Sequence, residues 1–500
     1  DKPDCGMSFM TYTPATASVN GEKVYEKYAS EMAQAGCDIF TFVVDLGGVY
    51  GYSPTIWPEP DRWDFAYLDA SGEAILKAAG PEARIIVQLY IDAPAWWIEQ
   101  HPDDRLRFED GGDRYPEKYF ALPHPGPFAS IASEAWRTDM KRAMDALIEH
   151  VDASAYGGRV MGYQICGQKT EEWYHWSMNA PQLGDYSAPM LARFRDWLRA
   201  RYQTDEALRR AWHKDDVTFD TAAIPAQAER FGDPAQTFRD PAREQNVIDF
   251  HRFWSDIMAD TIGYFAKVVK EKTNRTKVVG GFYGYLFEFA ELAEDAGHLA
   301  LGNLLRNPDM DFIMTPSSYH RRTLDGGQCV FRAPTLSLNL NGKLYWNDFD
   351  AASYKFFEKD QAALAPWRDQ MGITNTPEEF TWMMRRELGH ALATGVNMVH
   401  FDLQGGYYDD PAILDGVKEC RAIRERALNH TGDKAAQILV VVDEDSLHFM
   451  GFRNPIVRKV LIEQLAELPF VAPYDTVLLS DLARVDMSPY RLVIMTNTFK

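Results

Sequence analysis

The feature that most constrains the fold is the regular alternation of short apolar runs with stretches of helical periodicity. The runs are rich in β-branched and aromatic residues, which favours buried strands over loops. Eight such strands alternating with helices are typical of an α/β fold of the (β/α)8 type, the TIM barrel, and not of a sandwich. The eight predicted strands cover residues 5–14, 37–46, 84–90, 160–165, 277–285, 311–319, 343–350 and 397–404.

A doubly wound parallel sheet is the main alternative architecture. It would carry a Gly-rich phosphate-binding turn after its first strand, and no such turn follows residues 5–14. The polar stretch 222–243 has no clear period, so we expect a surface insertion there. The predicted helices cover residues 22–35, a stretch ending near 79, and residues 133–151, 188–202, 245–272, 377–394 and 411–428.

A second, smaller unit is expected after the barrel. Residues 431–434 (TGDK) look like a linker, and the apolar runs 436–442, 474–480 and 490–496 are strand candidates around a helix near 455–465. This pattern predicts a small α/β domain. We therefore divide the chain into a barrel over residues 1–430 and a second domain over 434–500, which we expect to continue beyond the last residue.

Composition narrows the class of partner. The 500 residues carry a formal net charge of −21, which argues against nucleic acid, because phosphates need clustered lysine and arginine. The acidity suits an enzyme that acts on a neutral substrate. No apolar run reaches membrane-spanning length, so we expect no membrane contact. There is no signal-peptide pattern, and the compartment stays open.

The clearest candidate catalytic residues follow the fourth predicted strand. The apolar run 160–165 opens into a glycine-containing loop that carries two adjacent carboxylates, Glu171 and Glu172, beside Trp173 and other aromatic residues. A barrel presents its catalytic groups at the carboxyl ends of its strands. Aromatic faces beside carboxylates suit a sugar, whose C–H faces stack and whose hydroxyls form hydrogen bonds. The stretch favours a sugar-cleaving enzyme; the plain alternative is a surface loop that happens to contain two glutamates.

Cleavage of a glycosidic bond needs two carboxyl groups, one as acid and one as nucleophile or base. The fourth and seventh strands lie nearly opposite each other in an eight-stranded ring, so Glu171 or Glu172 pairs naturally with Asp348. In the alternative, Asp350 is the nucleophile and Asp348 orients a substrate hydroxyl. The predicted substrate-binding residues are Asp45, Trp96, Trp97, Gln164, Trp173, Tyr283, Tyr319, His320, Trp346, Asp350 and Gln404.

Other chemistries have less support. No HExxH, HxH or similar ligand spacing occurs, and five scattered cysteines lack CxxC spacing, so we expect no metal and no cofactor. A Ser-His-Asp hydrolase would need a G-x-S-x-G turn, which the chain lacks. Trp96 and Trp97 fit wall packing as well as a sugar subsite, and His320 fits a structural role.

At these residues the chain resembles glycoside hydrolase family 42, the β-galactosidase-like members of the retaining TIM-barrel glycosidases. The likeness lies in the start of the first strand and in residues 63–69 (WDFAYLD), 93–97 (APAWW) and 162–165 (GYQI). It implies a β-galactoside-like substrate, a retaining mechanism and a tyrosine, here Tyr319, that hydrogen-bonds the nucleophile. It also implies that residues 434–500 begin a flavodoxin-like domain, which in that family mediates trimer formation.

The chain departs from the family at both catalytic positions. The family follows its Gly-Trp-Gln strand directly with Asp-Asn-Glu, where the Glu is the acid/base, whereas residues 166–170 (CGQKT) intervene here. The family's Glu precedes an aromatic residue, which favours Glu172 over Glu171, but the usual Asn before it is missing. At the seventh strand the family has a Glu nucleophile, and this chain has the shorter Asp348. Retention, inversion and an inactive site are all compatible with that change.

We therefore predict a glycoside hydrolase that removes a terminal, β-linked sugar from a carbohydrate, with Glu172 as acid and Asp348 as nucleophile. The first alternative is a sugar-binding protein that has kept the pocket and lost the nucleophile. The second is an assembly role driven by the C-terminal domain. Galactose as the sugar, and a homotrimer as the assembly, follow only from the resemblance.

Overall fold

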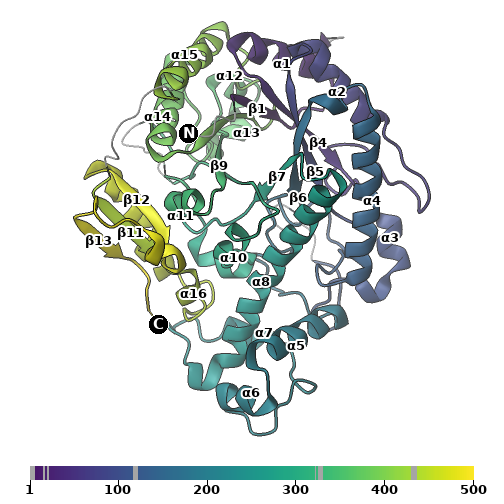
Figure 1. The fold of residues 1–500 in the computed structure, drawn as a ribbon, viewed down its shortest axis with the longest axis vertical. Helices are drawn as coiled ribbons and strands as arrows, with labels where there is room; N and C mark the ends of the chain where they lie inside the picture. Colours follow the sequence, from purple (N-terminus) through teal and green to yellow (C-terminus); the bar gives the residue numbers. More distant parts are fainter. Residues whose placement is uncertain are drawn as a thin grey trace.

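The computed structural model describes residues 6–14, 17–19, 22–115, 122–320, 322–324, 330–428 and 436–499. Within them, eight parallel strands close into a barrel in the order β1-β10-β9-β8-β7-β6-β5-β4 (Figure 1). The TIM-barrel prediction is confirmed, and each predicted run contains one barrel strand. These strands are β1 (Ser8–Thr11), β4 (Ile39–Asp45), β5 (Arg84–Tyr90), β6 (Val160–Cys166), β7 (Val278–Phe282), β8 (Phe312–Pro316), β9 (Leu344–Phe349) and β10 (Asn397–Asp402).

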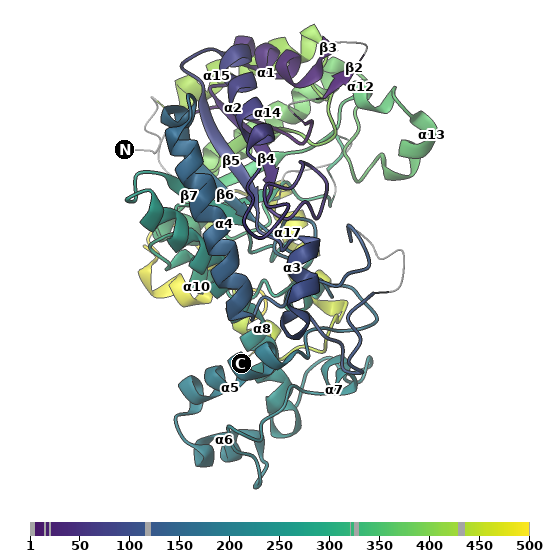
Figure 2. The same cartoon turned by 90° about the vertical axis from the view of Figure 1, so that its right-hand side faces the viewer.

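Helices surround the barrel, and α5 to α7 extend away from it at the bottom of both views (Figures 1 and 2). A two-stranded ribbon, β2 (Ser18–Val19) and β3 (Glu22–Lys23), precedes the first helix. The helices are α1 (Val24–Ala35), α2 (Ala66–Ala79), α3 (Ala95–Gln100), α4 (Glu134–Ala153), α5 (Ala188–Tyr202), α6 (Asp205–Trp212), α7 (Gln227–Phe231), α8 (Pro241–Lys272), α9 (Ala293–Ala296), α10 (Leu301–Leu305), α11 (Thr335–Leu340), α12 (Tyr354–Phe357), α13 (Gln361–Leu364), α14 (Pro377–Thr394) and α15 (Pro411–Leu428). Single 3₁₀ turns are η1 (Pro102–Asp104), η2 (Gly157–Arg159), η3 (Ala290–Leu292) and η4 (Ala365–Trp367).

The barrel interior is packed with side chains, as in other barrels of this size. Phe312 of β8 and Trp346 of β9 stack there with their ring centroids 4.6 Å apart. Strand side chains alternate between two faces, so the face of β9 that carries Trp346 also carries Asp348. The packed interior therefore positions a carboxylate at the carboxyl end of β9.

Two adjacent glycines in β7 allow the neighbouring strands to approach closely. A Cβ atom at Gly280 would lie 2.3 Å from the ring of Phe312, and one at Gly281 would lie 2.6 Å from the carbonyl oxygen of Ile165. Both distances are far below van der Waals contact, so no larger side chain fits there. The two glycines therefore let β6 and β8 pack closely against β7.

The C-terminal residues form a separate parallel sheet, shown in yellow beside α11 (Figure 1). The amide of Leu478 donates to Oγ of Ser337 in α11 at 2.8 Å, which ties the sheet to the barrel. The predicted linker, residues 431–434, lies outside the described residues. The elements are β11 (Ile438–Val442), β12 (Tyr474–Leu478) and β13 (Leu492–Met495) in the order β12-β11-β13, with α16 (Glu444–Leu447), the π-helix η5 (Arg458–Glu463), α17 (Gln464–Glu467) and the 3₁₀ helices η6 (Leu468–Phe470) and η7 (Leu479–Arg484).

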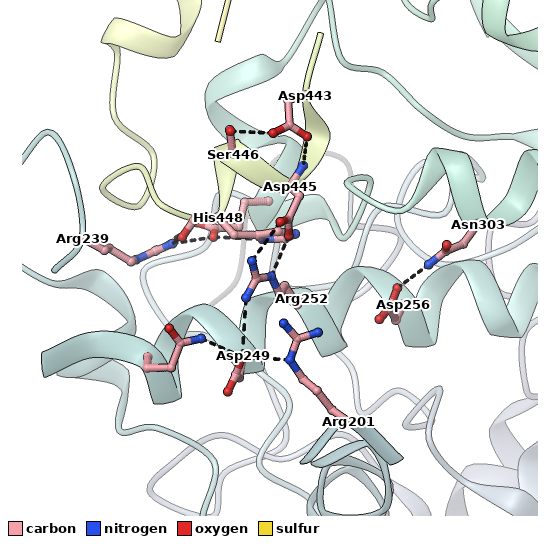
Figure 3. A network of polar contacts seen from close by, with 12 residues as sticks. Arg201, Arg239, Asp249, Arg252, Asp256, Asn303, Asp443, Asp445, Ser446 and His448 are labelled. Atoms are coloured by element: carbon pink, nitrogen blue, oxygen red, sulfur yellow. Dashed lines mark hydrogen bonds and ion pairs between the residues drawn. The ribbon is translucent and has the colours of Figure 1, made fainter. Parts of the chain in front are cut away.

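An ion pair and a hydrogen bond join this C-terminal unit to α8 and to the residue Arg239 just before it (Figure 3). Arg252 of α8 donates from Nε and Nη2 to the two carboxylate oxygens of Asp445 at 2.6 and 2.9 Å. Arg239, just before α8, donates to the carbonyl of His448 at 2.7 Å and to Oε1 of Glu294 at 2.5 Å. Most of residues 222–243, predicted as a surface insertion, are exposed or half-buried, while the buried Arg239 contacts the C-terminal unit.

Candidate active site

A cavity of about 320 Å³ opens at the carboxyl ends of the barrel strands. Barrel enzymes carry their active sites at this end. The cavity brings together the two glutamates of the loop after β6 and two aspartates at the end of β9. The described lining residues are Tyr12, Tyr50, Tyr52, Leu122, Pro123, Thr170, Glu171, Glu172, Phe282, Pro316, Tyr319, Asp348, Asp350, Phe401 and Leu403.

The loop after β6 has an unusual backbone that directs its glutamates into the cavity. The amide of Trp173 donates to the carbonyl of Gly167 at 3.0 Å, which closes the loop tightly. Left-handed backbone at non-glycine residues costs roughly 1–3 kcal/mol each and is concentrated at functional sites. The residues with positive φ are Gln168 (60°), Thr170 (57°), Glu171 (65°) and Trp173 (58°).

Glu171 is buried, and its carboxylate forms hydrogen bonds with tyrosine hydroxyl groups. Tyr90 donates its hydroxyl to Oε2 of Glu171, and Tyr12 forms a second side-chain hydrogen bond with the carboxylate. Burial raises the pKa of Glu171 well above its usual value, and the charges of Glu172 and Asp348 raise it further. The surroundings therefore favour the protonated form, which is the form that a general acid needs.

Glu172 lies in a different electrostatic setting from its neighbour. Thr170 donates Oγ1 to Oε2 of Glu172 at 2.8 Å, and Nη1 of Arg332 approaches Oε1 to 3.9 Å. Burial raises the pKa of Glu172, whereas the charge of Arg332 and hydrogen bonds from Thr170 and Tyr285 lower it. A negative charge is thus better stabilised on Glu172 than on Glu171.

Asp348 lines the cavity at the end of β9. Its side chain is fully buried, and among the described residues neither of its carboxylate oxygens has a hydrogen-bond partner. Burial raises the pKa of Asp348 well above its usual value, and the nearby Asp350 adds to the rise. An unpaired buried carboxylate is costly, so Asp348 favours its neutral form in this setting.

Asp350 lies just beyond β9 and has two strong partners. Tyr319 donates its hydroxyl to Oδ2 at 3.0 Å, and Arg322 forms an ion pair with Oδ1. The resemblance implied that Tyr319 would bond Asp348. The structure places this hydrogen bond on Asp350 instead, because Asp350 extends the same face of β9 toward the loop that carries Tyr319.

Three charged residues near the cavity escaped sequence reasoning. Arg332 is buried, and its guanidinium lies over the rings of Tyr319 and Tyr285, at 4.3 and 5.0 Å from their centroids. Glu288 accepts the amide of Tyr319 at 3.1 Å. These two residues and Arg322 belong to long loops after β7 and β8. They were missed because we sought functional residues only at the carboxyl ends of the strands. The one local signal for Arg332 is its position inside an apolar stretch.

Asp45 and Asp402 hold loops and do not face the cavity. Asp45 accepts the amides of Gly48 and Tyr50 at 2.7 and 2.8 Å, and Asp402 accepts the amide of Gly406 at 2.8 Å. Burial raises the pKa of each aspartate to about 6, against the opposing effect of these amides. The prediction that Asp45 binds substrate is therefore corrected, since its carboxylate is occupied by the Gly-Gly turn after β4.

Four predicted aromatic contacts pack in the barrel wall instead of lining the cavity. The indole N–H or phenol O–H of each side chain already donates a hydrogen bond to another residue of the protein, so we assign these side chains to packing. Trp96 donates to the carbonyl of Trp57 (2.9 Å), Trp97 to Asp139 of α4 (2.8 Å), Trp173 to the carbonyl of Ile165 (3.0 Å) and Tyr283 to the carbonyl of Gly297 (2.8 Å).

The four other predicted contacts are also absent from the described lining. Gln164 and Trp346 are buried within β6 and β9. His320 is half-buried, and its amide donates to Oγ of Ser318 at 3.1 Å. Gln404 is exposed, and the residue before it lines the cavity in its place.

Apart from Tyr319, the aromatic surface of the cavity comes from residues that were not predicted. Tyr12 lies next to β1, with its ring centroid 5.0 Å from those of Tyr52 and Phe401. Tyr50 stacks on Tyr52 at 5.7 Å. Tyr12 and Phe401 flank or end barrel strands, so the strand-end rule could have found them. Tyr50 and Tyr52 lie within the loop after β4, away from a strand end, so the strand-end rule does not identify them.

In the part of the chain that the structure describes, no group of three or more His, Cys, Asp or Glu side chains is arranged to hold a metal ion. No helix in this part has both the length and the hydropathy needed to cross a membrane.

Comparison with known sequences relates the chain to β-galactosidases. Beta-galactosidase BgaH of Haloferax lucentense is 25% identical over 279 residues, which are 55% of this chain and 37% of that protein. Beta-galactosidase BgaA of Thermus sp. is 26% identical over 204 residues, 40% of this chain and 27% of that protein. The chain thus spans well under half the length of these curated relatives.

Solved structures show the same fold at low sequence identity. The beta-galactosidase of the psychrophilic Marinomonas ef1 superposes with a TM-score of 0.62 at 14% identity, over 98% of this chain and 72% of that one. The beta-galactosidase of Halorubrum lacusprofundi gives 0.62 at 17% identity, over 98% and 68%. The family model of glycoside hydrolase family 42, described as beta-galactosidase, matches residues 11–302. That match covers more than half of the sequence, and the chain belongs to glycoside hydrolase family 42.

Proposed function

We propose that this chain hydrolyses terminal β-galactosides. The observation that carries the proposal is the cavity at the barrel mouth, where four carboxylates from two nearly opposite strands converge in a member of family 42. The curated relatives are named beta-galactosidases, which supports galactose as the sugar. The rings of Tyr12, Tyr52 and Phe401 supply apolar faces against which the C–H face of a sugar stacks.

Hydrolysis requires one carboxylic acid and one carboxylate. In the proposed reaction, a glutamate of the 171–172 pair protonates the leaving oxygen while an aspartate of the 348–350 pair attacks the anomeric carbon. The glycosidic C–O bond breaks, and a glycosyl ester forms on the aspartate. The glutamate then takes a proton from water, which attacks the same carbon, releases the aspartate and leaves the anomeric configuration retained. The sequence pattern favours Glu172 and Asp348 for these roles.

A substrate panel tests the proposal. Purified protein is assayed with 4-nitrophenyl β-galactoside, with the α-galactoside and the β-glucoside as controls, and proton NMR identifies the first anomer released. We expect turnover of the β-galactoside with the β-anomer appearing first. The α-anomer first would indicate inversion. Sugar binding without turnover of any substrate would favour the binding protein that has lost its nucleophile.

The proposed mechanism predicts a displaced basic limb in the pH profile of kcat/KM. Of the two glutamates we propose Glu171 as the acid, because burial and two neighbouring carboxylates raise its pKa well above its usual value. The acid then stays protonated above the free glutamate value of about 4.3. Activity should fall only as pH rises through this raised pKa, and should fall again at low pH as the nucleophile takes a proton. Initial rates across the pH range check the prediction, and a basic limb near the free glutamate value would contradict it.

We also infer that the C-terminal sheet begins a flavodoxin-like domain through which the protein forms trimers. The parallel order β12-β11-β13 supports a domain of the α/β class, and the trimer rests on the family resemblance. Light scattering coupled to size exclusion should report three times the mass of the chain; a monomeric mass would contradict this inference.

A further inference from the structure

We propose that Asp350 is the nucleophile, and that Arg322 and Tyr319 are positioning residues that hold its carboxylate toward the anomeric carbon. This inference rests on the proposed function and allots a role that the sequence pattern gives to Asp348. The choice between the two aspartates follows from what each of them touches.

Both aspartates are sterically possible nucleophiles. They lie two residues apart at the end of β9, so strand alternation places them on the same face. Both line the cavity. Position alone does not separate them, and the difference lies in how each carboxylate is stabilised.

Charge separates the two aspartates. Asp350 has the guanidinium of Arg322 at one carboxylate oxygen and the hydroxyl of Tyr319 at the other. The ion pair is buried: the side chain of Arg322 is 3% exposed and that of Asp350 is 5% exposed. Asp348 has no hydrogen-bond partner for either oxygen among the described residues. Two close, buried carboxylates do not both ionise readily. The ion pair with Arg322 and the hydrogen bond from Tyr319 therefore stabilise a carboxylate at Asp350, and a nucleophile must be ionised.

Arg322 is itself held rigidly, which makes it suitable for positioning. Its Nη2 also donates to the carbonyl of Ser317 at 2.9 Å, and its guanidinium lies 4.5 Å from the ring centroid of Tyr319. Its own carbonyl accepts Nη2 of Arg386 at 2.8 Å. A fixed guanidinium and phenol leave the carboxylate of Asp350 little rotational freedom, and such preorganisation lowers the barrier of an attack that needs one geometry.

Asp348 then acts as a neutral neighbour. Burial and the charge of Asp350 keep the pKa of Asp348 raised, so its carboxyl group carries a proton. A protonated carboxyl is a hydrogen-bond donor, which allows Asp348 to bind a sugar hydroxyl without repelling Asp350.

The reaction step is explicit for Asp350. One of its carboxylate oxygens forms a bond to the anomeric carbon as the bond from that carbon to the leaving oxygen breaks, and the leaving oxygen takes the proton of the acid. Water later adds to the anomeric carbon, gives its proton to the same acid and releases Asp350 as a carboxylate. No further reagent is needed.

Covalent trapping tests the assignment. The wild-type protein is treated with an activated 2-deoxy-2-fluoro-β-galactoside, digested and mapped by mass spectrometry. We expect the sugar on the peptide's Asp350 and not on Asp348. A label on Asp348 would overturn the inference while leaving the proposed function intact, and a wild-type protein without galactosidase activity would overturn both.

Variants provide a second measurement. Asp350→Gly should lose about 10⁴-fold or more in kcat, and azide should restore turnover of an activated aryl β-galactoside and yield the α-galactosyl azide. Asp348→Asn should lose far less, because its amide still donates a hydrogen bond. The opposite ranking, or the α-azide from the Asp348→Gly variant instead, would overturn the inference.

The positioning role has its own readout. Arg322→Met should lower kcat with little change in KM, because the carboxylate of Asp350 loses the guanidinium that fixes its direction, and Arg322→Lys should restore much of kcat. An Arg322→Met protein that loses kcat and KM together, without rescue by Arg322→Lys, would show that Arg322 is merely structural.

Discussion

Glu171→Gln should lower kcat on substrates with poor leaving groups, such as lactose, by about 10²–10⁴-fold, the usual contribution of a general acid. The glutamine keeps the size of the side chain and its contact with Tyr90 but has no proton to give to the leaving oxygen. An aryl galactoside with an acidic phenol needs no such proton, so its first step should be much less affected. Steady-state kinetics on the two substrate types measure the difference.

The neighbouring variant, Glu172→Gln, is the matched control. Glu172 lies beside Arg332 and accepts Thr170 Oγ1, so its negative charge is stabilised. Burial and the charges of Glu172 and Asp348 raise the pKa of Glu171 and outweigh the hydrogen bond from Tyr12, which lowers it. We therefore expect Glu172→Gln to show no dependence on the leaving group. If that variant, and not Glu171→Gln, is rescued by activated leaving groups, the acid is Glu172, as the sequence pattern favours.

Arg239→Met should lower the free energy of unfolding by about 3–5 kcal/mol, the range for breaking a buried ion pair by removing one partner. Arg239 and Glu294 are almost fully buried and are joined by two hydrogen bonds of 2.5 and 2.9 Å. The change leaves Glu294 as a buried charge beside His251 and His448. It also removes the hydrogen bond to the carbonyl of His448. Urea unfolding at neutral pH measures the loss.

The same ion pair predicts how this loss depends on pH. Burial alone would raise the pKa of Glu294, but Arg239, His251 and His448 together outweigh burial and hold that pKa far below its usual value. A depressed carboxyl pKa stabilises the fold at pH values above the unfolded value of about 4.3, and the contribution shrinks as pH falls below it. The difference between wild type and Arg239→Met should therefore narrow in acid.

Arg243→Met is the control for the loss of a positive charge in the same segment. Arg243 is 85% exposed and lies 3.7 Å from Asp240, and exposed pairs of this kind contribute about 0–1 kcal/mol. Equal effects of the two substitutions would show that the buried ion pair of Arg239 and Glu294 contributes no more to stability than an exposed pair does.

The sequence determined the barrel and most of its elements, because strand and helix periodicity are local properties of the chain. Helices α5, α14 and α15 begin and end at the predicted residues. Each has a proline as its first or second residue, and α5 and α14 follow directly on a capping Ser or Thr. It also located the two glutamates and two aspartates of the cavity. Barrel topology alone places the carboxyl ends of strands together.

Only the tertiary structure decided which side chains reach the cavity and which carboxylates are paired. Asp45 ends β4 and Trp97 lies in α3 after β5, yet their polar groups are taken by partners within the fold. Arg322 and Arg332 come from loops far along the chain, and their positions depend on how those loops fold over the barrel mouth. Charge and pKa follow from distances between residues remote in sequence, and such distances are set by packing, which no local pattern encodes.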